Sequence, residues 1–174
     1  IVEGDTVLTC DIETFETQPK KVLSTLSEYH TGEDDDYTIK ITLSNGTINH
    51  NTNSHPYFVK EKGWVSYRPD ITLEKYKLQV GQLEIGDIVY TYVRENELDQ
   101  IEITGIEESR EGVRTYNLSN VEDNHNFFAN GVLVHNKKCF TPGQKVLMGD
   151  GTLTPIENVN IGDEVTTMNG DTAI

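Results

Sequence analysis

Residues 135–139 read His-Asn-Lys-Lys-Cys, and they carry the densest reactive chemistry of this 174-residue sequence. An Asn side-chain amide can attack its own backbone carbonyl, forming a succinimide and cutting the peptide bond that follows, if imidazoles move protons and polarise the carbonyl. Asn136 would cut the bond to Lys137 in this way. The adjacent His135 supplies one imidazole, and we expect His125 to supply a second.

Cys139 offers a second reaction at the same junction. A Cys thiol can attack the carbonyl of the preceding residue, here Lys138, and convert that amide into a thioester when the leaving amine is protonated. Taken singly, these residue types usually have ordinary roles, because buried Cys packs, terminal Asn forms turns and a lone His is structural. Their combination is what indicates self-processing chemistry.

Short β-type segments must position this junction. Segments rich in β-branched or aromatic residues are 6–10, 37–43, 88–93, 101–103 and 131–134. Turn dipeptides bound several of them, namely Asn45-Gly46, Asn130-Gly131, Asp150-Gly151 and Asn169-Gly170. The pattern predicts an all-β fold with at most one or two short helices.

Residues 19–29 are the best helix candidate, since Val22, Leu23, Leu26 and Tyr29 fall near helical spacing. The β-rich surroundings favour a strand for the same residues. Both interpretations stay open at this point.

Two internal similarities indicate a repeated plan. Residues 83–89 (LEIGDIV) resemble residues 159–165 (VNIGDEV), and each reads as a Gly-Asp turn that leads into a strand. A second pair sets residues 37–39 and His55 beside residues 115–118 and His125. We therefore expect two-fold pseudosymmetry.

Composition narrows the classes of function. Fourteen basic and twenty-nine acidic residues give a formal charge of −15, which repels phosphate and argues against a nucleic-acid partner. No apolar run has the length of a membrane span, and two cysteines define neither a disulfide framework nor a zinc site. We expect one domain over residues 1–174, with no cofactor, metal or membrane partner and a cytoplasmic location.

Other reactive-looking residues have structural interpretations. Alternation along residues 7–10 favours burial of Cys10 in the core over a role as nucleophile or disulfide partner. The acidic run 33–36 lacks an ion-loop spacing and is predicted to be a solvated loop. Trp64 is expected in the core.

The junction resembles the intein family, whose first residue is Cys and whose last two are His-Asn. Residues 139–147 (CFTPGQKVL) resemble the intein opening. The likeness continues through residues 149–151, 155–156 and 161–163. Residues 52–56 look like the family's Thr-x-x-His block, which implies that Thr52 and His55 assist the first acyl shift.

The closing blocks of the family are matched as well. Residues 116–118, 125–127 and 135–136 resemble them, with both expected histidines. Asn117 aligns with a position that is often acidic in the family. Where the family presents Cys, Ser or Thr after His-Asn, this chain has Lys137, whose amine is mostly protonated at neutral pH.

The blocks occur in permuted order. Residues 1–136 correspond to the C-terminal intein portion and residues 139–174 to the N-terminal portion, with Lys137-Lys138 as a linker or residual flanking sequence. The resemblance implies a circularly permuted mini-intein or bacterial intein-like domain without an endonuclease. It also implies the Hint horseshoe, whose natural ends lie side by side, so that a two-residue bridge can close them.

The resemblance implies single-turnover protein splicing or self-cleavage, with the chain's own flanking (extein) peptide as substrate, rather than a multiple-turnover enzyme. A monomer and a strand-exchanged dimer both fit. The alternatives are a Hint domain of the hedgehog or toxin-associated kind, which needs no terminal Asn, and a noncatalytic acidic β-domain that binds a protein or peptide.

Overall fold

The computed structural model describes residues 3–136, 140–157, 165–166 and 172–173. Within them the chain is built from strands and a single helix, α1 (Pro69–Tyr76). The first strands are β1 (Thr6–Cys10), β2 (Thr17–His30), β3 (Thr38–Leu43), β4 (Ile48–Thr52), β5 (Tyr57–Val59), β6 (Gly63–Ser66), β7 (Gly81–Gln82) and β8 (Ile88–Arg94). The others are β9 (Glu97–Ser109), β10 (Val113–Val121), β11 (Asn126–Ala129), β12 (Val132–His135), β13 (Lys145–Leu147), β14 (Leu153–Pro155), β15 (Val165–Thr166) and β16 (Thr172–Ala173).

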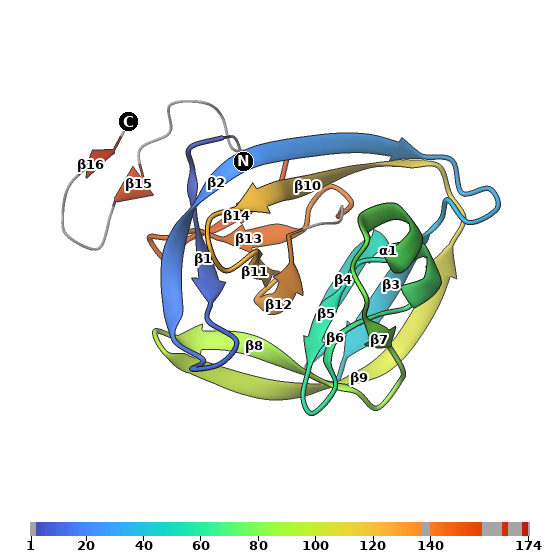
Figure 1. Cartoon of the computed structure of the whole chain (residues 1–174), viewed down its shortest axis with the longest axis horizontal. Helices are drawn as coiled ribbons and strands as arrows, with labels where there is room; N and C mark the ends of the chain where they lie inside the picture. Colours follow the sequence, from blue (N-terminus) through green and yellow to red (C-terminus); the bar gives the residue numbers. More distant parts are fainter. Residues whose placement is uncertain (1–2, 137–139, 158–164, 167–171, 174) are drawn as a thin grey trace.

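The strands form a curled, all-β molecule, as the sequence predicts. The largest sheet runs in the order β14-β13-β11-β12-β5-β8-β9-β3-β4, with β6 and β7 attached beside β5. A second sheet has the order β1-β2-β10, and β15 pairs with β16. Figure 1 shows the long ribbons β2–β10 and β8–β9 curling along opposite edges, with β11, β12 and β13 between them. The architecture is the horseshoe expected of a Hint domain.

Every segment predicted above as a strand contains one. Residues 6–10 form β1, 38–43 form β3, 88–94 form β8, 97–109 form β9 and 132–135 form β12. The turn at Asn130-Gly131 joins β11 to β12 with φ angles of 49° and 79°, the left-handed pair that a two-residue hairpin turn requires. The first Gly-Asp turn, at Gly86, leads into β8, whereas its counterpart at residues 162–163 lies outside the described residues.

Residues 19–29 are a strand, which settles the open choice. Strand β2 pairs with β1 through residues 17–21 and with β10 through residues 22–30. Leu23, Leu26 and Tyr29 remain 42%, 51% and 57% exposed, so their near-helical spacing does not mark a core-facing stripe. Cross-strand pairing outweighs a weak helical pattern here.

Helix α1 has no strong sequence signal because it is only 8 residues long. It begins with Pro69 at its first turn and ends at Lys77, whose φ of 55° closes the helix in the left-handed region. Only Ile71 and Thr72 are buried. No described helix is long and apolar enough to serve as a membrane span.

Two clusters of buried apolar side chains form the core. The larger one includes Ile39, Ile41, Leu118, Phe127 and Phe140, which come from β3, β10, β11 and the segment after residue 139. The smaller one contains Cys10 with Leu8, Phe128, Leu133 and Leu147. Residues 140–157 therefore share a core with residues 3–136.

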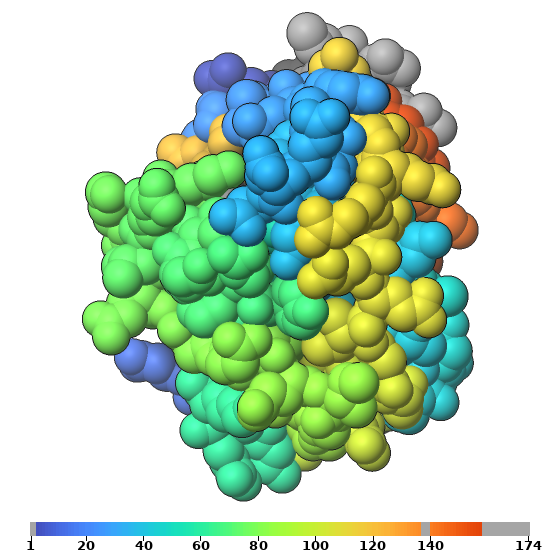
Figure 2. Space-filling model, turned by 90° about the vertical axis from the view of Figure 1, so that its right-hand side faces the viewer, coloured from blue at the N-terminus to red at the C-terminus, as the bar shows by residue number. Residues whose placement is uncertain are grey.

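The acidic run 33–36 is a loop held by contacts with His30, Arg68 and Arg110. Asp35 lies 2.6 Å from Arg68, and Asp36 lies 2.6 Å from Nδ1 of His30. Arg110 donates to the carbonyl of Asp34 at 3.0 Å. Figure 2 shows this blue loop against the yellow segment that carries Arg110. The carboxylates of Asp35 and Asp36 contact protein groups, and the run lies in a loop, in agreement with the loop interpretation.

Candidate active site

Asn136 lies directly after β12 and is 1% exposed. Its backbone N–H donates to the carbonyl of His125 at 3.0 Å, which extends the antiparallel β11–β12 pairing by one step. This backbone hydrogen bond holds Asn136 at the start of β11, with its side chain inside the molecule.

The Asn136 side-chain amide contacts a potential base. In the orientation that satisfies its neighbours, Nδ2 donates to the carbonyl of His125 at 3.1 Å and to Nδ1 of His135 at 3.3 Å. Its Oδ1 accepts from the backbone N–H of Val121 at 2.6 Å. Nδ1 of His135 acts as an acceptor in this arrangement, so the proton of the neutral ring lies on Nε2. The reactive nitrogen of Asn136 thus faces the lone pair of an imidazole.

His135 is positioned by a hydrogen bond of its backbone and by a contact of its ring. Its backbone N–H donates to the carbonyl of Pro56 at 3.1 Å, and the residue is 7% exposed. The ring makes an edge contact with Trp64, with centroids 4.9 Å apart and planes at 70°. Trp64 is only partly buried and belongs to neither core cluster, so the expectation that it lies in the core is wrong. Nothing in the sequence signalled its contact with His135.

Asn117 lies on β10 and is 3% exposed. Its Nδ2 donates to the backbone carbonyl oxygen of Asn136 at 3.2 Å. This oxygen belongs to the carbonyl that Asn cyclisation would attack. Asn117 therefore contacts the backbone carbonyl of Asn136, and the His135 imidazole contacts the Asn136 side chain.

Thr52 and His55 occupy one buried turn, at the end of β4. The backbone N–H of His55 donates to the carbonyl of Thr52 at 3.0 Å. His55 is 0% exposed and Thr52 is 5% exposed. The His55 ring lies 4.3 Å from that of Phe140, between centroids. Oγ1 of Thr52 is buried and has no hydrogen bond to any residue in the described ranges.

Phe140 anchors the chain immediately after the candidate nucleophile Cys139. It exchanges backbone hydrogen bonds of 2.7 Å in both directions with Tyr116 of β10, and it forms a bridge with Asn51 of β4. Thr52 and Asn117 are the next residues along these two strands. Lys137, Lys138 and Cys139 themselves lie outside the described residues.

His125 differs from the other predicted site residues. Its side chain is exposed, and its φ of 51° places it in a turn between β10 and β11. Its carbonyl, in contrast, accepts from both the backbone and the side chain of Asn136. The structure thus brings the backbone of His125 to the site, and the role of its imidazole stays a prediction.

Cys10 has the packing role expected of it. It is fully buried, and burial, with a smaller effect of Asp11, raises the pKa of its thiol to about 12. Its backbone N–H donates to Oδ1 of Asn126 at 2.8 Å, and its carbonyl accepts from Nδ2 of Asn126 at 2.7 Å. A thiol with this pKa is protonated at neutral pH and is a poor nucleophile.

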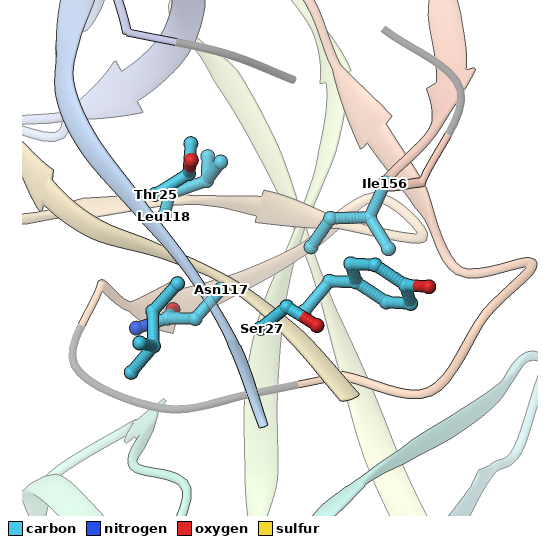
Figure 3. A pocket seen from close by; sticks show the side chains of 7 residues that line it. Thr25, Ser27, Asn117, Leu118 and Ile156 are labelled. Atoms are coloured by element: carbon cyan, nitrogen blue, oxygen red, sulfur yellow. The ribbon is translucent and has the colours of Figure 1, made fainter. Parts of the chain in front are cut away.

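A pocket lies between the β2–β10 ribbon and the segment 140–157. Its walls are Thr25, Leu26, Ser27, Tyr116, Asn117, Leu118 and Ile156. Figure 3 shows Ile156 facing the residues of the ribbon from the later segment. The walls next to the candidate site therefore come from both parts of the chain. The described residues contain no group of three His, Cys, Asp or Glu side chains that could hold a metal ion.

The sequence did not predict the backbone groups that contact the Asn136 side chain. The N–H of Val121 and the carbonyl of His125 orient the Asn136 amide, and no residue type signals them. The donor role of Asn117 was also missed, although its alignment with the closing block marked the position.

One family model matches part of the chain. The Ataxin-1 and HBP1 module (AXH) matches residues 10–94, slightly less than half of the sequence. This range contains Thr52 and His55 but neither Asn117 nor Asn136. A search of curated proteins found no match.

Solved structures of inteins match most of the chain. The bacterial intein-like domain from Clostridium thermocellum superposes with a TM-score of 0.56 at 22% identity, covering 81% of this chain and 83% of that one. A DnaB intein from Synechocystis sp. PCC 6803 gives 0.56 at 19% identity over 77% and 80%. The gp41-1 intein gives 0.54 at 25% identity over 78% and 83%. The chain therefore has the Hint fold of these inteins and intein-like domains.

Proposed function

We propose that the chain is a single-turnover self-processing domain that cuts its own backbone after Asn136. The observation that carries this proposal is the contact of 3.3 Å between Nδ2 of Asn136 and Nδ1 of His135. An amide nitrogen is a weak nucleophile, and a neighbouring base that takes its proton during attack makes the reaction faster. Both groups are already buried and oriented, which reduces the entropic cost of reaching the reactive geometry.

The first step is Asn cyclisation. Nδ2 of Asn136 bonds to its own backbone carbonyl carbon, and the bond from that carbon to the nitrogen of Lys137 breaks. His135 takes a proton from Nδ2 and returns a proton to the leaving amine. The products are residues 1–136, ending in a succinimide, and a second piece that begins with the free amine of Lys137.

The second step is an acyl shift at Cys139. The thiol attacks the carbonyl of Lys138, the sulfur–carbon bond forms, the amide bond breaks, and the nitrogen of Cys139 leaves as an amine. Support comes from Phe140, the next residue, whose ring packs against His55 close to Thr52. We assign Thr52 and His55 to the support of this shift, as the resemblance implies.

Cleavage, rather than ligation, is the expected outcome in this chain. Lys137 has no hydroxyl or thiol to receive the acyl group, and its side-chain amine is mostly protonated at neutral pH. The thioester is then resolved by water or by an added thiol. The substrate is the flanking peptide of the chain itself.

We also propose the permuted order, in which residues 139–174 correspond to the N-terminal intein portion and residues 1–136 to the C-terminal portion. Support comes from the packing of the later segment into the sheets of the earlier one. Strand β13 pairs with β11 through Val146 and Ala129, and Met148 bridges Val7 of β1. Residues from both sides of Lys137-Lys138 thus complete one architecture.

Intact mass of the purified chain over time, with and without a thiol, tests the function. Cleavage after Asn136 that is abolished in Asn136→Ala, and thiol-dependent release of residues 139–174 that is abolished in Cys139→Ala, are the expected results. Cys10→Ala is the matched control and keeps both cleavages. Cleavage that needs Cys139 but not Asn136 would instead support the hedgehog-type or toxin-type Hint reaction. An unchanged mass under every condition would reject self-processing in favour of a binding domain.

A further inference from the structure

The geometry points to Asn117 as the residue that stabilises the negative charge developing on the Asn136 carbonyl oxygen during cyclisation. This inference deepens the proposed function and rests on it. When Nδ2 of Asn136 attacks, the carbonyl oxygen gains electron density and becomes a stronger hydrogen-bond acceptor. A fixed donor aimed at that oxygen lowers the barrier without having to reorganise.

Asn117 meets the requirements of such a donor. Its Nδ2 lies 3.2 Å from the carbonyl oxygen of Asn136, and both residues are almost fully buried. Strand β10 fixes its backbone, because Asn117 pairs with Leu26 in the middle of the β2–β10 register. Burial removes competing water, so the hydrogen bond acts in a surrounding of low polarity.

The other atom of the same side chain supports a role beyond folding. Oδ1 of Asn117 is buried and has no hydrogen-bond partner within the described part of the chain. An unpaired buried acceptor costs about 1–3 kcal/mol, so an apolar residue would serve packing at least as well. The donor half of the amide is the part that has a defined target.

The chemical type of the side chain matters in addition to its size. A carboxylate has nearly the same shape as the Asn amide, but it has only acceptors when ionised and would repel the carbonyl oxygen. Asn117 therefore replaces the acidic type, often found at this position of the family, with a permanent donor. Its ability to donate does not change with pH.

Single-turnover rates of cleavage after Asn136 test the inference in Asn117→Ala and Asn117→Asp. We expect both variants to cleave about 100-fold more slowly than the unmodified chain at neutral pH. Lowering the pH protonates the buried carboxyl of Asn117→Asp, whose pKa burial raises, and restores a donor. The rate of Asn117→Asp should therefore rise relative to Asn117→Ala as the pH falls.

Asn49→Ala is the matched control. Asn49 is also buried, donates from Nδ2 to a backbone carbonyl, that of Ala129, at 3.3 Å, and has an unpaired Oδ1 within the described residues. Removing it costs a similar hydrogen bond away from Asn136 and should leave the cleavage rate within about threefold. Equal slowing in Asn49→Ala and Asn117→Ala, or a constant ratio between the two Asn117 variants at all pH values, would overturn the inference.

A second measurement is made on chain that has not yet been cleaved. In chain labelled with carbon-13 at Asn carbonyls, with Cys139→Ala introduced to keep the second bond intact, the Asn136 resonance reports hydrogen bonding at its oxygen. Asn117→Ala should shift this resonance, and Asn49→Ala should not. An unmoved resonance rejects the donor role, whereas absence of cleavage in the unmodified chain rejects the proposed function.

Discussion

Replacing His135 by Gln removes the imidazole that contacts the Asn136 amide while keeping a polar side chain of similar length. Nδ1 of His135 lies 3.3 Å from the attacking nitrogen, a distance at which a base can take the proton. General-base assistance is worth about 100- to 10,000-fold in rate. The variant should therefore cleave after Asn136 slower by this factor, which corresponds to about 2.7–5.5 kcal/mol of barrier.

Loss of the contact with Trp64 is too small to produce a rate change of that size in this variant. The His135 ring makes an edge contact with Trp64 at 4.9 Å, and such a pair contributes roughly 0.5–1.5 kcal/mol beyond its buried area. A domain with about 5–15 kcal/mol of stability stays folded after this loss. Trp64 is the single Trp of the chain, so its emission during urea unfolding measures stability at the site.

The assay compares cleavage rates and unfolding midpoints of the unmodified chain, His135→Gln and His50→Gln. His50 is the matched control, since its Nε2 lies 2.8 Å from Oγ1 of Thr38, and among the described residues its side chain makes no hydrogen bond to Asn136. A rate for His135→Gln within tenfold of the unmodified chain, with the fold intact, would refute the general-base assignment. Equal slowing in His50→Gln would show that the effect is structural.

Two further predictions concern residues away from the reaction. In the folded Cys139→Ala chain, Cys10 should resist alkylation at pH 8, because burial raises the pKa of its thiol to about 12. Mass spectrometry should find the Cys10 adduct only after the chain is unfolded. Rapid labelling of the folded chain contradicts this prediction. Burial alone would raise the pKa of Asp36, but hydrogen bonds from Thr31 and His30 lower it overall, so its stabilising effect is present at neutral pH and lost as pH falls through the folded pKa. Asp36→Asn should therefore unfold in less urea than the unmodified chain at pH 7, with a loss of about 1 kcal/mol or less for this partly exposed pair, and the difference should shrink as the pH falls below 3.8. A difference that grows with acid contradicts this prediction.

Sequence patterns predicted most of the fold because strands and tight turns have local signals. Alternating β-branched residues identify β1, β3, β8 and β12, and the Asn130-Gly131 dipeptide identifies the β11–β12 turn. Strand β2 remained ambiguous from sequence, since what decides it is pairing with β10, nearly a hundred residues away along the chain. Helix α1 escaped because its 8 residues bury only two side chains.

The proximity of two residue pairs of the candidate site was predictable from sequence, whereas the backbone groups around them were not. His135 and Asn136 adjoin in sequence and also meet in space, and Thr52 and His55 share one turn, so local spacing was sufficient for both pairs. The orientation of the Asn136 amide depends on the N–H of Val121 and the carbonyl of His125. These groups exist in every residue type, so only the folded geometry selects them.

The same dependence on backbone geometry gives Cys10 an indirect part in the chemistry. Its N–H and carbonyl hold the Asn126 side chain at 2.8 Å and 2.7 Å, and Asn126 pairs with His135 in the β11–β12 register. A slip of one residue in that register would move the His135 side chain to the opposite face of the sheet, because side chains alternate along a strand. Strand β1 therefore fixes the pairing that lets an imidazole and an amide meet, although the thiol of Cys10 takes no chemical part. It follows that changes to the side chain of Cys10 should be tolerated, whereas loss of the Asn126 amide should impair cleavage without touching the reacting atoms.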